Sequence, residues 1–155
     1  MRITKSLLIY NLVCNSLVSL ALCLGASLMS LPFDWKLFGI DYAFSFCLAM
    51  LIGLTIPFVS IGRWFTALFK IPNDTYTHNI RYRLLATLII TVIYFALIST
   101  SLTVFNYFYL GQNDFGQVFL KSLTNVPVLF LIDFTASFCF DIPAYKAAHK
   151  IDDSF

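Results

Sequence analysis

The sequence predicts an all-α integral membrane protein, a four-helix bundle, and two observations carry that prediction. Four long apolar stretches fill the chain, and each approaches or exceeds the roughly 20 residues that cross about 30 Å of hydrocarbon. Apolar residues make up 59% of the chain and charged residues 12%, against about 45–50% and 25% in soluble domains. A soluble core of this size could not bury so much apolar surface.

The apolar stretches define the expected elements in order. We predict one transmembrane domain over residues 1–155, with spans at about residues 7–31, 42–62, 84–108 and 121–141. The first stretch is too long for the apolar region of a cleavable signal peptide, so we expect it to remain as a span. Pro57 and Pro127 predict kinks in the second and fourth spans, because proline lacks a backbone donor and clashes with the preceding turn.

The basic residues predict the orientation of these spans. Eight of the ten lie before the first span, between the second and third, or after the fourth. Loops rich in Lys and Arg stay in the cytoplasm, so both termini are expected there. The net charge of +2 follows from this topology and does not indicate nucleic-acid binding.

Each half of the chain follows the same plan, with a long span, an outer connection containing Phe-Gly, a second span and a basic inner segment. This plan predicts two helical hairpins related as a parallel repeat, with duplication as one interpretation. The first half carries a pattern made of Asn11, Phe33, Trp35, Pro57 and Arg63. In this pattern the chain resembles an uncharacterised bacterial inner-membrane family, a domain of unknown function built from a two-helix unit. The resemblance implies a helical fold and a multi-pass location in the bacterial inner (plasma) membrane, and no chemistry.

Small residues at four-residue spacing predict helix contacts. Ser45, Ala49 and Gly53 form a shallow groove on the second span, where another helix backbone can approach closely. The first span repeats the spacing at Ser19, Cys23 and Ser27. We favour packing within one bundle over dimerisation through the groove.

One charged residue, Asp133, lies near the middle of a predicted span, about eight residues or roughly 12 Å from its inner end. A carboxylate at that depth costs about 2.5–3.5 kcal/mol on insertion scales. Three polar residues on other spans are expected at similar depth, namely Asn15, Thr91 and Tyr94, and Asn11 lies one turn from Asn15 on the same face of the first span. No basic residue shares this level, so we expect a neutral carboxyl group that is hydrogen-bonded to Asn15 or Tyr94.

Two further groups of residues receive structural interpretations. Asp141, at the end of the fourth stretch, is expected to reach the membrane surface. The cysteines contain no Cys-x-x-Cys pair, and we interpret them as small apolar packing residues. They are Cys14, Cys23, Cys47 and Cys139.

The sequence contains no catalytic motif, metal-ligand spacing or cofactor motif, so it predicts a protein that is not an enzyme and has no cofactor or metal. For Asp133 we favour a polar clasp between helices over a proton- or cation-handling site, and over a contact with lipid or another protein.

The favoured function is accordingly a non-enzymatic accessory or interaction protein. Its expected partners are the lipid bilayer and either a second copy or another membrane protein, with no nucleic acid. The alternative is an oligomeric small transporter or channel that uses a protonatable Asp133. The surroundings of Asp133 discriminate between them, because a water-filled cavity favours transport and a dry contact with Asn15 or Tyr94 favours the clasp.

Overall fold

The structure is a computed structural model that describes residues 5–29, 32–71, 79–111 and 114–150. These residues form the helices α1 (Lys5–Met29), α2 (Trp35–Thr55), α3 (Phe58–Leu68), α4 (Ile80–Tyr109) and α5 (Phe115–His149). No strand occurs in the described ranges. The helices α1, α2, α4 and α5 are each long and apolar enough to cross a membrane. The prediction of a helical protein with four long apolar helices is therefore confirmed.

Side-chain caps explain where three of the helices begin. Asp34 accepts hydrogen bonds from the backbone N–H groups at the start of α2, Asn79 does the same for α4, and Asp114 for α5. Such caps satisfy donors that have no partner within the helix. The cap at Asp34 starts α2 earlier than residue 42, where the second span was expected. Gly39 consequently lies within α2 and Gly116 in the first turn of α5, rather than in outer connections.

The second apolar stretch is divided, so the predicted span at residues 42–62 is wrong in its bounds. The last backbone hydrogen bond of α2 comes from its C-cap residue, Ile56, whose N–H donates to the carbonyl of Ile52 at 2.9 Å. Pro57 has no N–H to continue the ladder, and α3 begins one residue later. The expected kink is thus a complete break between two helices. In contrast, α5 contains Pro127 and Pro143 and still continues to His149.

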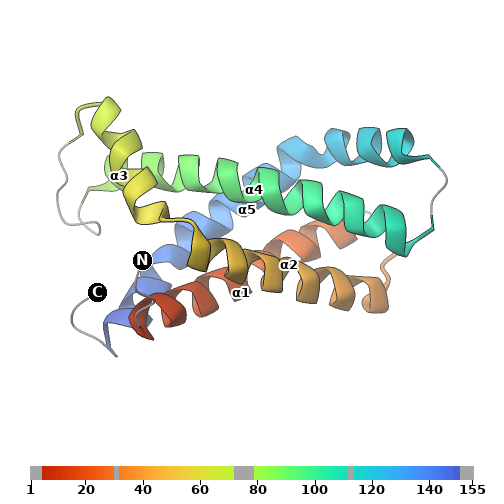
Figure 1. Ribbon diagram of the computed structural model, residues 1–155, viewed down its shortest axis with the longest axis horizontal. Coiled ribbons are helices and arrows are strands. Elements are labelled where there is room, and N and C mark those ends of the chain that lie inside the picture. The colour runs from red at the N-terminus through yellow and green to blue at the C-terminus, as the bar shows by residue number, and fades with distance from the viewer. Residues whose placement is uncertain (1–4, 30–31, 72–78, 112–113, 151–155) are drawn as a thin grey trace.

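The four long helices pack into one bundle, which Figure 1 shows with its long axis horizontal. The helix α1 packs against α2 and α5, while α4 packs against α2, α3 and α5. The starts of α1 and α4, the end of α5 and all of α3 lie at one end of the bundle, on the left of Figure 1. We call this the α3 end. It is the end that the basic residues predict to be cytoplasmic.

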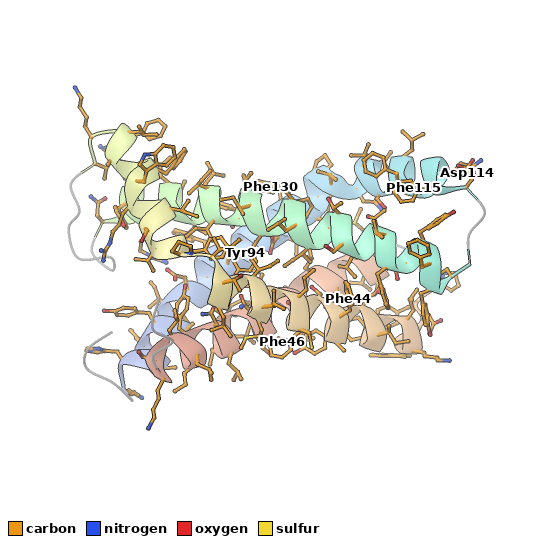
Figure 2. All side chains as sticks on the ribbon, in the orientation of Figure 1. Phe44, Phe46, Tyr94, Asp114, Phe115 and Phe130 are labelled. Carbon is orange, nitrogen blue, oxygen red and sulfur yellow. The ribbon has the colours of Figure 1, made fainter. Side chains whose placement is uncertain are left out.

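A small apolar cluster holds the middle of the bundle together. Its buried members are Leu22, Ala49, Ile52, Phe95 and Ile98. Many larger apolar side chains instead point outward around all four long helices, as the sticks of Figure 2 show. A protein with a small buried apolar cluster and a largely apolar outer surface suits a lipid environment better than water.

The groove predicted on α2 is occupied by side chains of the same chain. Ser45, Ala49 and Gly53 are all buried. A methyl group added to Gly53 would overlap the side-chain oxygen of Asn11 and lie 2.5 Å from the hydroxyl of Tyr94. The absence of a side chain at Gly53 therefore lets α1 and α4 bring polar groups against α2.

The three small residues at the same spacing on α1 are only partly buried. Ser19 and Cys23 are buried, whereas Ser27 is half-buried. Among the other cysteines, Cys14 is half-buried, and Cys47 and Cys139 are exposed on the outer surface of their helices. The interpretation as small packing residues fits the buried Cys23, whereas Cys47 and Cys139 do not pack inside this chain.

Candidate functional site

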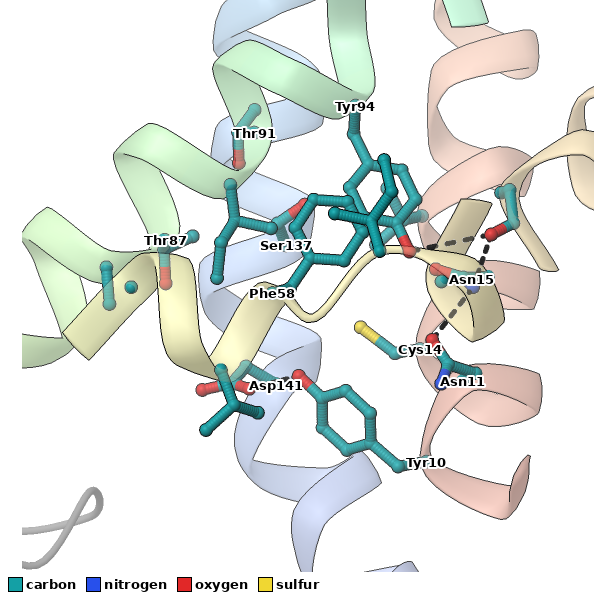
Figure 3. A pocket seen from close by; sticks show the side chains of 18 of the residues that line it. Tyr10, Asn11, Cys14, Asn15, Phe58, Thr87, Thr91, Tyr94, Ser137 and Asp141 are labelled. Carbon is teal, nitrogen blue, oxygen red and sulfur yellow. Dashed lines mark hydrogen bonds between the residues drawn. The ribbon is translucent and has the colours of Figure 1, made fainter. Parts of the chain in front are cut away.

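A cavity of about 980 Å³ lies between α1, the α2–α3 break, α4 and α5, and Figure 3 shows part of its wall. Its lining residues run from Leu7 to Leu22 on α1, from Tyr82 to Ile98 on α4 and from Asp133 to Tyr145 on α5. These segments all belong to the α3 end and the middle of the bundle. Leu22, Ala49 and Ile98 belong both to the lining and to the central apolar cluster. This cluster therefore closes the cavity at the middle of the bundle.

The break at Pro57 accounts for the cavity. Beyond it, α3 packs onto α4, where Gly62 brings the two helices so close that an added methyl would lie 3.3 Å from the Cβ of Ala86. Because α3 leans toward α4, the space beside α1 is not filled by a continued α2. The lining residues Val59, Ser60 and Arg63 of α3 are exposed, which places an opening beside this helix.

The structure brings together the polar residues that the sequence proposed as a candidate site. Asn11, Asn15, Thr91, Tyr94 and Asp133 all line the cavity. Ser137, one turn beyond Asp133 on α5, joins them in the same wall.

The hydrogen bonds among these residues differ from the expected clasp. The Asn15 amide donates to the backbone carbonyl of Ala49 at 3.2 Å and to the Asn11 side-chain oxygen at 3.4 Å. The Tyr94 hydroxyl donates to the same Ala49 carbonyl at 3.5 Å. Asn15 and Tyr94 therefore bind the backbone of α2, which the small residues of that helix leave accessible, and they do not hold Asp133.

Asp133 is 3% exposed and lines the cavity. Within the described part of the chain it makes no hydrogen bond and no ion pair. The hydroxyl of Thr91, which is also buried and in the cavity wall, has no hydrogen-bond partner either. The predicted contact of Asp133 with Asn15 or Tyr94 is therefore wrong. Buried polar groups are normally hydrogen-bonded, whereas the wall contains two, the Asp133 carboxyl group and the Thr91 hydroxyl, that have no hydrogen-bond partner among the described residues.

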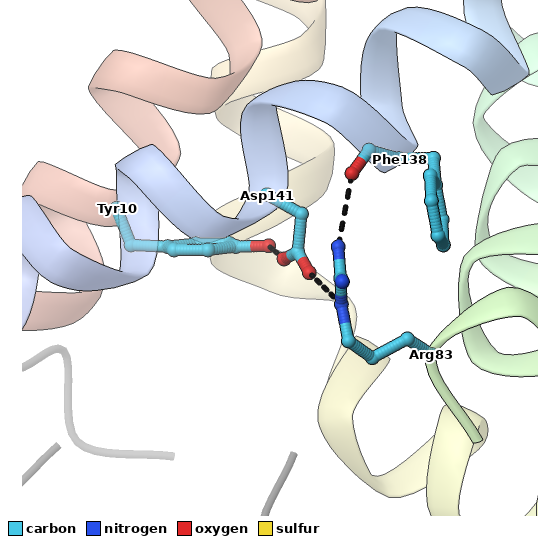
Figure 4. A network of polar contacts seen from close by, with 4 residues as sticks. All are labelled: Tyr10, Arg83, Phe138 and Asp141. Carbon is cyan, nitrogen blue, oxygen red and sulfur yellow. Dashed lines mark hydrogen bonds and ion pairs between the residues drawn. The ribbon is translucent and has the colours of Figure 1, made fainter. Parts of the chain in front are cut away.

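The other acidic residue of α5 in the cavity wall, Asp141, has partners on two other helices. It is 3% exposed, so the expectation that it reaches the membrane surface is wrong. The Tyr10 hydroxyl donates to one of its carboxylate oxygens at 2.6 Å. Nε of Arg83 lies 3.6 Å from the other oxygen. Figure 4 shows this network, which joins α1, α4 and α5 at the α3 end.

Arg83 makes two further contacts that fix its side chain. One of its terminal nitrogens donates to the backbone carbonyl of Phe138 at 3.0 Å, and the guanidinium carbon lies 4.6 Å from the centre of the Phe138 ring. The carboxylate, the carbonyl and the ring face together compensate the charge of Arg83 in this buried position. In the sequence, Arg83 stands out only as one of the basic residues on the expected cytoplasmic side. Opposite charges at the inner ends of the third and fourth stretches were the signal for this pair.

Aromatic and apolar surface makes up much of the remaining wall. Phe58, the first residue of α3, stacks on Tyr94 with ring centres 4.5 Å apart. Tyr10, Tyr82 and Tyr145 also line the cavity, together with aliphatic residues such as Ile90. The cavity thus combines an apolar and aromatic wall with a few polar groups, which is the usual composition of a small-molecule site.

No group of three or more His, Cys, Asp or Glu residues that could hold a metal ion occurs in the described ranges. Comparison with protein-family models, with curated proteins and with solved structures finds no match for this chain.

Proposed function

We propose that this protein binds a small solute in the cavity from the cytoplasmic side and acts as a transporter in the bacterial inner membrane. The observation that carries the proposal is Asp133, a buried acidic group that faces a cavity of about 980 Å³ and has no partner among the described residues. This is the environment that favours transport over the clasp. The proposal replaces the accessory role that the sequence alone favoured.

The carboxyl group of Asp133 has an energetic cost at its buried position. An ionisable group inside a membrane span is expensive, and such groups usually mark ion or substrate pathways. A clasp would offset this cost by a hydrogen bond between helices, which Asp133 does not make within the described residues. The cost is understandable if a ligand supplies the missing partner.

The shape of the site supports access from one side at a time. The cavity opens beside α3 and ends at the central apolar cluster. Solute sites of transporters commonly lie near the middle of the membrane, next to a discontinuous helix, and the interruption between α2 and α3 forms part of this wall. Transport requires a second arrangement in which the opposite end opens. Four spans enclose little space, so we expect an oligomer.

Labelling from outside tests for that second arrangement. Ser45 is fully buried on α2, beyond the cavity lining and toward the expected outer end. In a variant whose native cysteines are replaced by alanine, Ser45→Cys should react slowly with a membrane-impermeant thiol reagent added to intact cells. Lys146→Cys, which is exposed at the α3 end, controls for reagent that crosses the membrane and should stay unlabelled. A Ser45→Cys variant that never reacts would contradict transport.

A further inference from the structure

We infer that the solute is an organic cation, an ammonium or related group attached to an aromatic or apolar body. The inference rests on the proposed function and adds the chemical class of the ligand. It draws on the charge, the wall and the size of the cavity.

The charge of the cavity is set by its two acidic residues, and only one is neutralised. Asp141 is paired with Arg83 at 3.6 Å and accepts a hydrogen bond from Tyr10. Asp133 has no basic partner in the part of the chain that the structure describes. The basic residue of the lining, Arg63, is exposed at the opening. A single carboxyl group without a counter-ion, deep in a low-dielectric wall, is expected to be neutral while no ligand is bound. A positive charge on the ligand stabilises its ionised form, whereas an anion does not.

Helix dipoles do not change this sign. The end of α2 carries a partial negative charge and the start of α3 a partial positive one. Both lie in the same wall at Ile56 and Phe58, so their fields largely offset each other. Asp133 therefore decides which charge the cavity accepts.

The aromatic wall favours an organic cation over a bare metal ion. Tyr94 and its stacking partner Phe58, with Tyr10 on α1, present rings to the cavity. Ring faces attract ammonium groups by about 0.5–2 kcal/mol each. The unpaired hydroxyl of Thr91 can accept a hydrogen bond from an N–H donor. Most of the other lining groups are apolar and suit the hydrocarbon part of a ligand.

The volume points the same way. A cavity of about 980 Å³ lies at the upper end of the roughly 300–1,000 Å³ that pockets for drug-sized ligands occupy. An inorganic ion would leave most of this space to water and would not use the aromatic wall. A cation with a body of several carbon atoms fills more of it and contacts both parts of the site.

Protection of a cavity cysteine tests the inference without knowing the natural ligand. The full chain, with native cysteines replaced by alanine and Ser137→Cys added as the reporter, is placed in phosphatidylcholine nanodiscs and treated with N-methylmaleimide. Three aromatic probes differ in charge, namely benzyltrimethylammonium, benzyl alcohol and benzenesulfonate. We expect saturating benzyltrimethylammonium to slow labelling by about tenfold or more, and the neutral and anionic probes to have little effect.

The role of Asp133 is tested by matched substitutions. Asp133→Asn should raise the concentration of benzyltrimethylammonium that gives half protection by at least about tenfold. Asp114→Asn makes the same chemical change at an exposed N-cap outside the cavity, where Asn caps equally well, and it should leave protection unchanged. Thermal unfolding verifies that each variant is folded, and Asp133→Ser serves if the Asn variant is not.

The outcomes separate the two proposals. If the reporter at Ser137 does not react at all, the cavity is not accessible and both proposals fail. If it reacts but the cation protects no better than the other two probes, the ligand class is wrong and the proposed function stands. Protection that survives in the folded Asp133 variants would also overturn the inference, because the cation would then bind without this carboxyl group.

Discussion

Arg83 and Asp141 form a buried ion pair that joins the start of α4 to the last third of α5, with Nε and the carboxylate oxygen 3.6 Å apart. Asp141 of this pair lies in the wall of the cavity at the α3 end, where Tyr10 adds a hydrogen bond from α1. It holds together three helices around the opening and neutralises one of the two acidic groups that face the cavity. The charge of the site is consequently left to Asp133.

Breaking the pair should lower the free energy of unfolding strongly, although Nε of Arg83 and the carboxylate oxygen of Asp141 are as much as 3.6 Å apart. Arg83→Met leaves Asp141 buried without a counter-ion, and we expect a loss of about 3 kcal/mol in unfolding free energy. Arg81→Met, on the exposed side of the same turn, is the matched control and should change little. The double variant Arg83→Met/Asp141→Leu should recover much of the loss. Equal unfolding curves for Arg83→Met and Arg81→Met, measured in detergent, would show that the pair does not stabilise the bundle.

Gly53 should tolerate no side chain, whereas Gly39 on the same helix should. An added methyl at Gly53 overlaps Asn11 and Tyr94, but at Gly39 nothing lies within 4 Å. Overpacking costs about 1–3 kcal/mol, while Gly→Ala in an open helix position gains about 0.5–1 kcal/mol. Gly53→Ala should therefore lower the melting temperature and Gly39→Ala should not. The same shift in both variants would mean that Asn11 and Tyr94 do not pack on α2 as described.

The sequence was sufficient for the long helices because a membrane span leaves a simple signal, a long run of apolar residues. It misjudged the second span for two physical reasons. The cap at Asp34 allows α2 to start before Lys36 and Asp41, two charged residues that precede the expected start at residue 42. The break at Pro57 then ends α2 well before the apolar run ends. A kink and a complete break are not distinguishable from the position of a proline alone.

The candidate site was predicted in its members and not in its arrangement. Depth along each span grouped Asn15, Thr91 and Tyr94 with Asp133. The structure places these four residues and Asn11 in the wall of one cavity, which the sequence did not predict. Depth does not give the rotation of a helix about its axis, and this rotation decides which side chains form hydrogen bonds with each other. Asn15 and Tyr94 turned out to bind the Ala49 carbonyl. The cavity itself depends on where α3 packs after the break, which no local pattern encodes.

Asp133→Leu distinguishes a ligand site from a structural clasp by its effect on stability. Because Asp133 has no partner in the described structure, replacing it by an apolar residue removes a desolvation cost and should leave the melting temperature equal or higher. A clasp predicts a loss of about 0.5–2 kcal/mol. Asp141→Leu, which breaks the pair with Arg83, is the contrast and should destabilise. A loss in Asp133→Leu as large as in Asp141→Leu would favour the clasp.

The orientation can be tested with two exposed residues of α5. Gln117 lies near its start and Lys146 near its end. If the basic residues mark the cytoplasmic side, Gln117→Cys should react with an impermeant thiol reagent added to intact cells. Lys146→Cys should react only after the cells are permeabilised. The opposite pattern would invert the topology.

The central claim is that an accessible cavity enters the bundle from the α3 end and reaches the level of Asp133. The most direct measurement compares Ser137→Cys, in the cavity wall one turn from Asp133, with Ser45→Cys, buried beyond the lining. Both are placed in a background without native cysteines and treated with an impermeant thiol reagent on inside-out membrane vesicles. We predict rapid labelling of the cysteine at position 137 and, from this side, little at position 45. Equally slow labelling of the two would show that no open cavity reaches Asp133 and would contradict the account.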